Sequence, residues 1–346
     1  MLIPGKRPKL EQVKAALLHT QRKPLSIENV SVPTPGPNDI LIQVEACGIC
    51  HSDLHLLDGD WEFHQTPRIP GHEVVGIVAA AGEGVGNFKK GERVGVSWVY
   101  STCQSCASCR NGDPALCEQQ QVTGVTVNGG YAEFLIAPAS ACTRIPRTLN
   151  PELAAPLLCA GLTAYAGLKL AGLRKGENVV IQGLGGLGHL AIQLARIQGA
   201  RVITLTRSSE KGELALKLGS HDVIDLSEKD AITGINELNG ADVIFSSTIM
   251  PASIGKLIQT LRPNGRLIVV GGGRGTFQVN PIDLIARRLR IIGSPVGSQG
   301  DLAEILRLGA ENRVKASVET FPIDRVNEAL NRLRQGRVRF RAVLKF

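Results

Sequence analysis

Four cysteines lie within one short, turn-rich segment of the chain. They are Cys103, Cys106, Cys109 and Cys117 in the stretch CQSCASCRNGDPALC. Because a reducing cytosol disfavours disulfides, this density of thiols indicates metal binding. Two-residue spacers let a loop wrap one ion, and tetrahedral zinc needs four thiolates at about 2.3 Å. We expect a structural zinc site here, with an iron–sulfur cluster or unligated thiols as the alternatives.

A second set of metal-ligating side chains is scattered along the chain. The segment 47–55 carries two thiols, one of them Cys50, with two imidazoles, a hydroxyl and a carboxylate. His72 stands before Glu73 and after a proline-containing turn. Either segment alone is more typical of structural residues than of metal ligands. Together with Cys159 they supply the three protein ligands of an open zinc site, whose fourth position is left for a substrate.

A glycine motif follows a predicted strand directly. The sequence GLGGLG at 183–188 matches G-x-G-x-x-G at a strand-to-helix turn. The first glycine permits the tight turn, the second lets the backbone approach a pyrophosphate, and the third lets the helix meet the strand. The N-terminus of the helix then faces the phosphates with the positive end of its dipole. The predicted cofactor contacts in this loop are Gly183, Gly185, Gly186, Leu187 and Gly188.

The end of the second predicted strand departs from the usual NAD-binding pattern. An NAD site offers a carboxylate to the ribose 2′-hydroxyl, but here the strand is followed by Thr206, Arg207 and two serines. A carboxylate would repel a 2′-phosphate, whereas hydroxyls beside Arg207, with Lys211 one turn later, suit one. We therefore expect NADP to be preferred over NAD. The alternative is a solvated loop with two ordinary surface cations.

The elements that must position these residues alternate between strands and helices after residue 175. Short β-branched runs predict strands at 178–181, 201–205, 221–224, 242–245, 266–270 and 290–293. Apolar residues at helical spacing predict helices at 187–197, 211–218, 231–238 and 254–261. This alternation predicts a parallel, doubly wound sheet. The apolar window 153–173 contains a proline, three glycines and a lysine, so a buried helix is favoured over a membrane span.

Length and composition limit the class of protein. The 346 residues exceed what one hydrophobic core usually serves, so we expect two domains. With 43% hydrophobic and 20% charged residues, the chain is predicted to be globular rather than disordered. A net charge of +8 permits a nucleic-acid partner, but only 4% aromatic residues argue against base stacking. The first 14 residues lack the apolar stretch of a secretion signal, so we expect a cytoplasmic protein without a membrane partner.

In this order, the GHE segment, the four-cysteine segment and GLGGLG resemble the zinc-containing alcohol dehydrogenases of the medium-chain dehydrogenase/reductase family. The resemblance begins at Val13, so residues 1–12 extend beyond it and have no predicted role. It implies an α/β fold in which a GroES-like, β-rich catalytic domain holds an inserted Rossmann doubly wound parallel sheet. We expect the catalytic domain at 1–160 and 297–346, the nucleotide domain at 161–296, and a homodimer or homotetramer.

The resemblance also implies the roles of the metal-ligating residues. Cys50, His72 and Cys159 would hold a catalytic zinc ion, and the four clustered cysteines a structural one, giving two zinc ions per chain. Glu73 is similar to the acidic neighbour of the metal in this family. Asp53 is similar to the carboxylate that orients the histidine ligand.

Further matches concern the proton path, the substrate pocket and the cofactor. Ser52 and His55 resemble the hydroxyl and imidazole of a relay that passes through the cofactor ribose. Leu57 stands where some family members carry a bulky aromatic residue, while Trp61 and Trp98 match aromatic positions, which suggests a pocket for medium-chain or aromatic alcohols. The implied cofactor contacts outside the glycine loop are His51, Thr163, Val270, Ser294, Val296 and Arg341.

The resemblance predicts a reversible NAD(P)-dependent alcohol dehydrogenase that acts on small-molecule alcohols and aldehydes or ketones. Zinc would polarise the alcohol oxygen, and hydride would pass to the nicotinamide. A zinc-free quinone or enoyl reductase of the same fold is the alternative among enzymes. A nucleic-acid binder built around the four cysteines is the alternative of another class, but it leaves the glycine motif unexplained.

Overall fold

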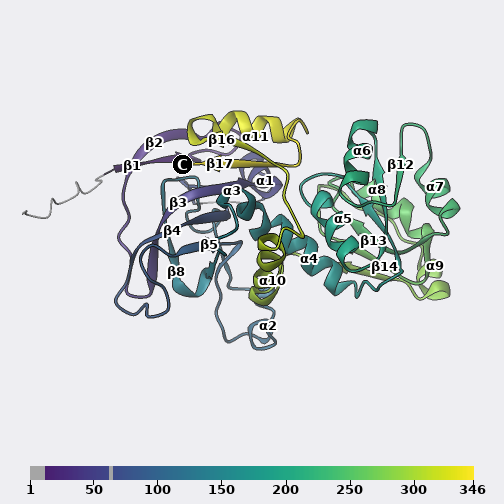
Figure 1. Cartoon of the computed structure of the whole chain (residues 1–346), viewed down its shortest axis with the longest axis horizontal. Coiled ribbons are helices and arrows are strands. Elements are labelled where there is room, and N and C mark those ends of the chain that lie inside the picture. Colours follow the sequence, from purple (N-terminus) through teal and green to yellow (C-terminus); the bar gives the residue numbers. More distant parts are fainter. Residues whose placement is uncertain (1–11, 62–64) are drawn as a thin grey trace, which may run out of the picture.

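The computed structural model describes residues 12–61 and 65–346. Two halves lie side by side, one built on a seven-stranded sheet and the other on a six-stranded sheet (Figure 1). Two predictions concern the start of the chain: that residues 1–12 extend beyond the family resemblance, and that the first 14 residues lack a secretion signal. Residues 1–11 lie outside the described residues, so the structure does not test these predictions. The first strand begins at Gln12.

The seven-stranded sheet is centred on the longest strand of the chain, β3 (Asp39–Ile49). Its other strands are β4 (Glu73–Ala81), β5 (Arg93–Val96), β8 (Phe134–Pro138), β9 (Cys142–Arg144), β16 (Val318–Pro322) and β17 (Arg341–Lys345). The order is β16-β17-β3-β4-β5-β9, with β8 also paired to β3. Because β17 pairs antiparallel with β3, the C-terminal strand of the chain belongs to the same sheet as its N-terminal strands β3 to β5.

Hairpins and short helices surround this sheet. Helix α1 (His51–Asp58) follows β3 directly, with Cys50 as its N-cap. It ends at Gly59, whose φ of +70° is the left-handed conformation that suits glycine. The other elements of this half are β1 (Gln12–Leu17), β2 (Ser26–Ser31), β6 (Val99–Ser101), β7 (Gln121–Val122), α2 (Ala107–Arg110), η1 (Pro114–Leu116), η2 (Ala139–Ala141), α3 (Pro151–Ala154), η3 (Ala155–Leu158), α10 (Gln299–Ala310), η5 (Ile323–Arg325) and α11 (Val326–Arg334).

The six-stranded sheet is entirely parallel, as the alternation of strands and helices predicted. Its strands are β10 (Asn178–Gln182), β11 (Arg201–Thr206), β12 (Asp222–Asp225), β13 (Ala241–Ser246), β14 (Leu261–Val269) and β15 (Arg290–Gly293). The order β12-β11-β10-β13-β14-β15 reverses direction at β10, which leaves a crevice at the carboxyl ends of β10 and β13. The predicted α/β fold with an inserted doubly wound sheet is confirmed.

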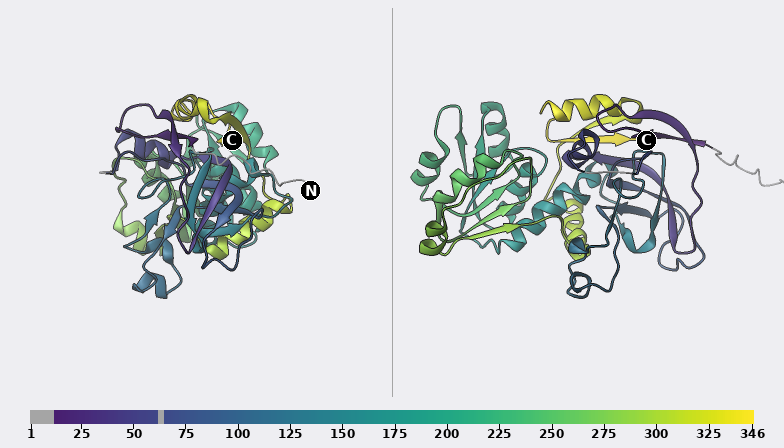
Figure 2. Two further views of the ribbon diagram at one scale, coloured as in Figure 1. Left: turned by 90° about the vertical axis from the view of Figure 1, so that its left-hand side faces the viewer. Right: turned by 180° about the vertical axis from the view of Figure 1, so that it is seen from behind.

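Helices cover both faces of this sheet (Figure 2). They are α4 (Ala160–Leu170), α5 (Gly188–Ile197) and α6 (Ser209–Lys217) on one side, and α7 (Ala231–Glu237), α8 (Pro251–Leu257) and α9 (Pro281–Arg287) on the other. The predicted helix at 254–261 is displaced. Pro251 occupies the first turn of α8, and the chain passes through a 3-10 turn, η4 (Ile258–Thr260), before β14 begins at Leu261.

The two halves share one continuous hydrophobic core. It contains Ala46 and Val75 of the first sheet, residues of α4 and α10, and Val179 of the second sheet. The window 153–173 forms a buried helix with flanking turns, as predicted. No single helix of the described residues is long and apolar enough to cross a membrane, and one pair, Pro151–Leu158 with Ala160–Leu170, passes that test only when joined across a 44° bend. The domain boundaries at 160 and 296 stay predictions.

A histidine on α5 ties the halves together and makes stability depend on pH. The ring of His189 is fully buried, stacks on Phe340, lies 3.1 Å from the Gly185 carbonyl through Nδ1, and accepts the Ser317 N–H at Nε2. Burial lowers the pKa of His189 to about 3. Below about pH 6.5 the unfolded chain therefore binds a proton that the folded chain does not, until the pH reaches the lower value. The contribution of His189 is complete above pH 6.5 and is lost as the pH falls.

We therefore expect His189→Asn to make the fold less sensitive to acid. Between pH 7.5 and pH 5, the free energy of unfolding of the unmodified protein should fall by about 2 kcal/mol more than that of the variant. Urea unfolding followed by circular dichroism at both pH values measures the difference. An equal fall in both proteins would show that His189 is protonated in the folded state.

Candidate active site and metal centres

Three metal-ligating side chains converge from three separate segments. Cys50 follows β3, His72 precedes β4, and Cys159 is the N-cap residue of α4. Their ligand atoms, together with a carboxylate oxygen of Glu73, all lie within 4.8 Å of one another. The sulfur atoms of Cys50 and Cys159 are 3.9 Å apart. The pairing of β3 with β4 and the packing of α4 against the first sheet bring these residues together.

The chemistry of this cluster fits a zinc ion. His72 is fully buried, yet neither of its ring nitrogens has a hydrogen-bond partner in the described structure. Leaving a buried nitrogen unpaired is costly, so a ligand for it is expected at this point. A hydrogen bond from the Cys159 thiol, together with His72 and Arg341 nearby, lowers the pKa of Cys50 well below its usual value. Thiolate and neutral imidazole are the ligands that zinc prefers.

Asp53 contacts two residues of this cluster, Cys50 and His72. Its carboxylate accepts the backbone N–H of Cys50 at 2.8 Å and the hydroxyl of the fully buried Tyr131 at 2.9 Å. Its other oxygen lies 3.5 Å from Nδ1 of His72, too far for a good hydrogen bond but close enough to interact as a charge. The predicted orienting carboxylate is thus next to the histidine that it would orient.

Glu73 and Arg341 form a buried ion pair behind the cluster. Burial raises the pKa of Glu73 to about 7, although Arg341 opposes the rise. Burial also works against the charge of Arg341, but Glu73 and the two cysteines raise its pKa above the usual value. The same guanidinium reaches the glycine loop, since a Cβ placed on Gly186 would lie 2.7 Å from its Nη1. Arg341 of β17 therefore contacts both candidate binding sites.

The glycine loop has the backbone geometry that its motif predicted. Gly183 adopts a φ of +98°, which a side chain would strain. A Cβ on Gly188 would lie 2.0 Å from the carbonyl oxygen of Gly183, so only glycine lets α5 approach β10 so closely. A Cβ on Gly185 would meet nothing within 4 Å, which leaves open space on the side where a phosphate would sit.

A cavity of about 1120 Å³ between the halves connects the cluster with the glycine loop. The sequence-predicted residues that line it are Cys50, His51, Ser52, His55, Trp61, Trp98, Cys159, Thr163, Gly183, Gly185, Gly186, Leu187, Thr206, Arg207, Lys211, Val270, Val296 and Arg341. His72 and Glu73 are completely buried behind the lining, and Gly188 is at the start of α5. Ser294 is buried beside the lining, and its N–H donates to the Val269 carbonyl.

Leu57 does not have the position that its predicted role requires. It is 4% exposed, belongs to the core beneath α1, and is not part of the cavity lining. The expectation that Leu57 helps to shape the substrate pocket is therefore wrong. The pocket wall next to the cluster is aromatic instead, with the rings of Trp61 and Trp98 edge to face at 6.0 Å and Trp98 edge to face with His72 at 4.9 Å.

Sequence reasoning missed three charged residues of the cavity, namely Arg334 of α11, which pairs with Asp58, and the two that follow. Asp60 lies between the end of α1 and Trp61, and Arg274 lies in the loop after β14. Both line the cavity, and they form an ion pair across it at 2.9 Å. The adjacent GDW segment was a weak signal for Asp60, because a charged residue next to a pocket tryptophan is itself a candidate. A lone arginine within the glycine-rich stretch GGGRG was the signal for Arg274.

The four clustered cysteines form a second candidate metal centre, in the lobe that carries α2 (Figure 1). All four sulfur atoms lie within 4.8 Å of one another, with Cys103 3.6 Å from Cys117 and 4.0 Å from Cys109. Backbone N–H groups, first that of Ser105, lower the pKa of Cys103 to about 6. No residue of α2 is buried, so the lobe has little apolar core to hold its shape.

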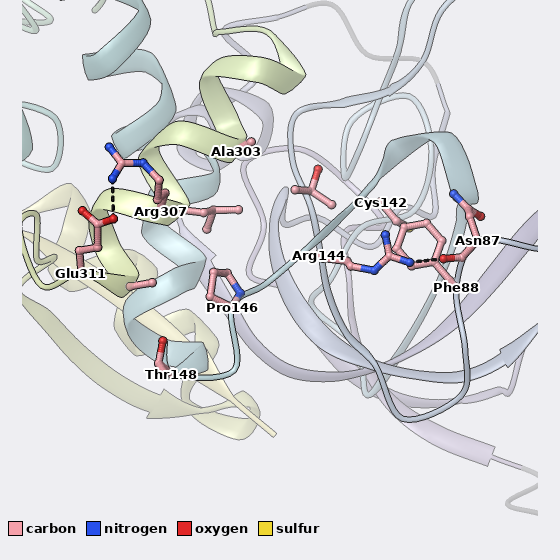
Figure 3. Close-up of a pocket in the computed structure, with 12 residues that line it drawn as sticks. Asn87, Phe88, Cys142, Arg144, Pro146, Thr148, Ala303, Arg307 and Glu311 are labelled. Carbon is pink, nitrogen blue, oxygen red and sulfur yellow. Dashed lines mark hydrogen bonds and ion pairs between the residues drawn. The ribbon is translucent and has the colours of Figure 1, made fainter.

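A second hollow, of about 710 Å³, lies between β9 and α10 (Figure 3). Its arginines already have partners. Arg144 stacks on Phe88 and binds the Asn87 carbonyl, while Arg307 pairs with both Glu304 and Glu311. Apart from the four clustered cysteines, the site residues predicted from the sequence lie in the first cavity or directly behind its lining.

Known proteins resemble this chain over nearly its whole length. A family model described as the alcohol dehydrogenase GroES-like domain matches residues 36–147, and one described as zinc-binding dehydrogenase matches residues 186–311. An alcohol dehydrogenase of Geobacillus stearothermophilus is 39% identical over 335 residues, which cover 96% of this chain and 99% of that protein.

Solved structures agree in fold. The alcohol dehydrogenase of Aeropyrum pernix is 34% identical with a TM-score of 0.88, covering 96% of this chain and 100% of its own. CAD from Helicobacter pylori, solved in complex with NADP(H), is 27% identical with a TM-score of 0.87, covering 96% and 98% of the two chains.

The two clusters should respond differently to the loss of one ligand. His72→Ala should remove one zinc ion per chain and leave Tm nearly unchanged, because an open site adds little to folding. Cys106→Ser should remove the other ion and lower Tm, because zinc holds a lobe that lacks its own core. Elemental analysis and calorimetry measure both quantities. A His72→Ala protein with its full zinc content would contradict the assignment of the first cluster.

Proposed function

The chain belongs to the zinc-binding alcohol dehydrogenases, NAD(P)-dependent oxidoreductases, and we propose that its interdomain cavity is where it interconverts alcohols with aldehydes or ketones. The observation that carries the proposal is the unpaired, fully buried His72 between two cysteine sulfurs, at the end of a cavity whose other end is a glycine loop. A zinc-free reductase of the same fold would have no use for this ligand set. A nucleic-acid binder would have no use for the glycine loop.

We propose that each end of the cavity has one task. When bound at the cysteine–histidine cluster and the glycine loop, zinc and NADP would supply a Lewis acid and a hydride acceptor. Trp61 and Trp98 surround the substrate with an apolar wall that excludes water and suits medium-chain or aromatic alcohols. Thr163 donates its hydroxyl to the Pro295 carbonyl, which joins α4 to the loop that closes the nicotinamide end.

A proton must leave the alcohol before its hydride is transferred. Ser52 is two residues beyond Cys50, and its hydroxyl oxygen lies 3.7 Å from the Cys50 sulfur, so it stands beside the cluster that would hold the zinc ion. His55, one turn further along α1, stands at the edge of the cavity with 18% of its side chain exposed. An imidazole can accept a proton at one ring nitrogen and release one from the other, so His55 is suited to pass the proton from the interior to water.

We propose that NADP is preferred because of the charges at the end of β11. Thr206 is buried and exchanges hydrogen bonds with Ser208, so no carboxylate faces the position of a ribose 2′-substituent. Arg207 and Lys211 both line the cavity, and neither belongs to an ion pair among the described residues. Two unpaired cations beside an uncharged strand end form a site for a phosphate.

We propose that a second copy of the chain covers the outer edge of the parallel sheet. β15 is the edge strand, and its backbone has no partner on the outer side within the described structure. Ile282 and Ile285 of α9 are 70% and 80% exposed, and Ile291 of β15 is 38% exposed. An exposed apolar edge of this kind favours pairing with an identical edge, in a homodimer or a homotetramer.

The thiol chemistry supports a reducing compartment, and we propose the cytoplasm. None of the eight cysteines forms a disulfide. Six of them belong to the two candidate metal centres, and Cys47 is three residues before one of these six, Cys50. Cysteines bind a metal as reduced thiolates, so both centres require a reducing environment.

The proposed activity is tested by initial rates over a panel of primary, secondary and benzylic alcohols. Ser52→Ala should lower kcat for alcohol oxidation by roughly 100-fold or more, because the alcohol proton loses its first acceptor. Zinc content and the Kd for NADPH, measured by fluorescence, should be unchanged. No turnover of any panel alcohol by the unmodified, zinc-loaded protein would rule out the proposal.

Cofactor preference is tested by comparing kcat/KM for NADP and NAD. One charge-assisted contact to the 2′-phosphate corresponds to roughly 10- to 150-fold in favour of NADP. Thr206→Asp combined with Arg207→Gly should reverse the preference by adding repulsion and removing attraction. Lys217→Gln removes a cation of the same helix outside the cavity and should leave the ratio as it was. A ratio in favour of NAD in the unmodified protein would show that Arg207 and Lys211 point into solvent.

A further inference from the structure

The imidazole of His55 has a charged partner, Asp60, that the motifs did not indicate, and Asp60 has a second one, Arg274. Nδ1 of His55 lies 2.7 Å from the Asp60 carboxylate, and the other oxygen of that carboxylate lies 2.9 Å from Nη2 of Arg274. All three residues line the interdomain cavity. The imidazole is also held between the rings of His51, at 5.2 Å, and Trp61, at 5.5 Å.

The turn that ends α1 brings Asp60 back to the histidine. Gly59, in the left-handed conformation, reverses the chain, and the backbone N–H of Asp60 then donates to the carbonyl oxygen of His55 at 3.0 Å. Backbone and side chain of Asp60 thus both bind the same residue. The contact between His55 and Asp60 is therefore built into the local fold rather than made by two free side chains.

The charge of Asp60 determines which ring nitrogen carries the proton. The hydrogen bond with His55, followed by the charge of Arg274, lowers the pKa of Asp60, so the carboxylate is ionised at neutral pH. An ionised carboxylate only accepts hydrogen bonds, so Nδ1 must be the donor. In the neutral ring Nε2 is then the free acceptor, the state in which His55 can take a proton from the interior of the cavity.

Arg274 comes from the opposite half of the molecule. It lies in the glycine-rich loop that follows β14, whereas His55 and Asp60 belong to α1 and the turn after it. Three ion pairs of the described residues join segment 161–296 to the rest of the chain: Arg274 with Asp60, Lys169 with Asp301, and Arg339 with Glu210. Of these, the first ends at the relay histidine.

We propose that Asp60 and Arg274 are positioning residues for proton transfer. Asp60 holds His55 in the tautomer whose Nε2 accepts the relay proton, and Arg274 holds Asp60 from the nucleotide side of the cavity. The geometry of the relay thereby depends on how the two halves are placed relative to each other. This inference rests on the proposed function and deepens its proton path.

A double-mutant cycle tests whether Asp60 acts through His55. Asp60→Asn should lower kcat for alcohol oxidation roughly 10- to 100-fold, since an amide can donate to Nδ1 and favour the wrong tautomer. In a His55→Ala background the same change should cost less than about 2-fold, because the residue it positions is gone. Zinc content and the Kd for NADPH should stay constant, and Asp60→Glu should restore part of the rate. Equal losses in both backgrounds would overturn the proposal.

Arg274 has a matched control on another interdomain ion pair. Arg274→Gln should lower kcat by about 2- to 5-fold, the range of a partly exposed ion pair. Lys169→Gln breaks an ion pair between the same two segments away from the cavity and should leave kcat unchanged. Equal effects of the two variants would show that Arg274 serves only to hold the halves together, and would remove it from the proposal.

A spectroscopic readout separates this inference from the proposed function. The ¹⁵N shifts of His55, assigned with His55→Gln, should report a protonated Nδ1 and a free Nε2 at pH 8, and a changed tautomer ratio in Asp60→Asn. A protonated Nε2 in the unmodified protein would overturn the proposal even if the alcohols are turned over. Absence of turnover with the expected tautomer would instead overturn the proposed function alone.

Discussion

The structure depends on a buried polar cluster that must have partners. His72 and Glu73 are completely buried, Arg341 is almost so, and neither ring nitrogen of His72 has a hydrogen-bond partner. A buried polar group without a partner lowers the stability of the fold, so neighbouring side chains must offer it a hydrogen bond or an opposite charge. Arg341 neutralises Glu73, Asp53 lies beside His72, and the remaining nitrogen faces the two cysteine sulfurs, where a metal ion fits.

Arg341 connects this buried cluster with the glycine loop of the other half. It stands on the last strand, pairs with Glu73 at the cysteine–histidine cluster, and lies against Gly186 of the glycine loop. The return of the chain to the first sheet therefore closes the fold and also places one cation between the two candidate binding sites. The continuous core through α4 keeps the halves together, and the cavity lies between them beside that core.

The features predicted from sequence were those in which a local pattern has one physical solution. The glycine motif required a positive φ at Gly183 and a close helix approach at Gly188, and both are present. The predictions that failed depended on packing. The helix expected at 254–261 has the right apolar spacing, but Pro251 starts α8 three residues earlier, and β14 already begins at Leu261. Leu57 matches a position where some family members carry a bulky aromatic residue, but its side chain on α1 packs into the core.

The four-cysteine loop, the glycine turn and the order of strands and helices could be predicted from local patterns, because residues only a few positions apart have few conformations that satisfy their backbone and ligand chemistry. Which distant side chains meet depends on the folded chain as a whole. Cys50, His72 and Cys159 converge because β3 pairs with β4 and α4 packs beside them. Asp60 meets Arg274 because the two halves face each other across the cavity. Contacts of this kind depend on how whole elements pack, and spacing along the chain does not encode that packing locally.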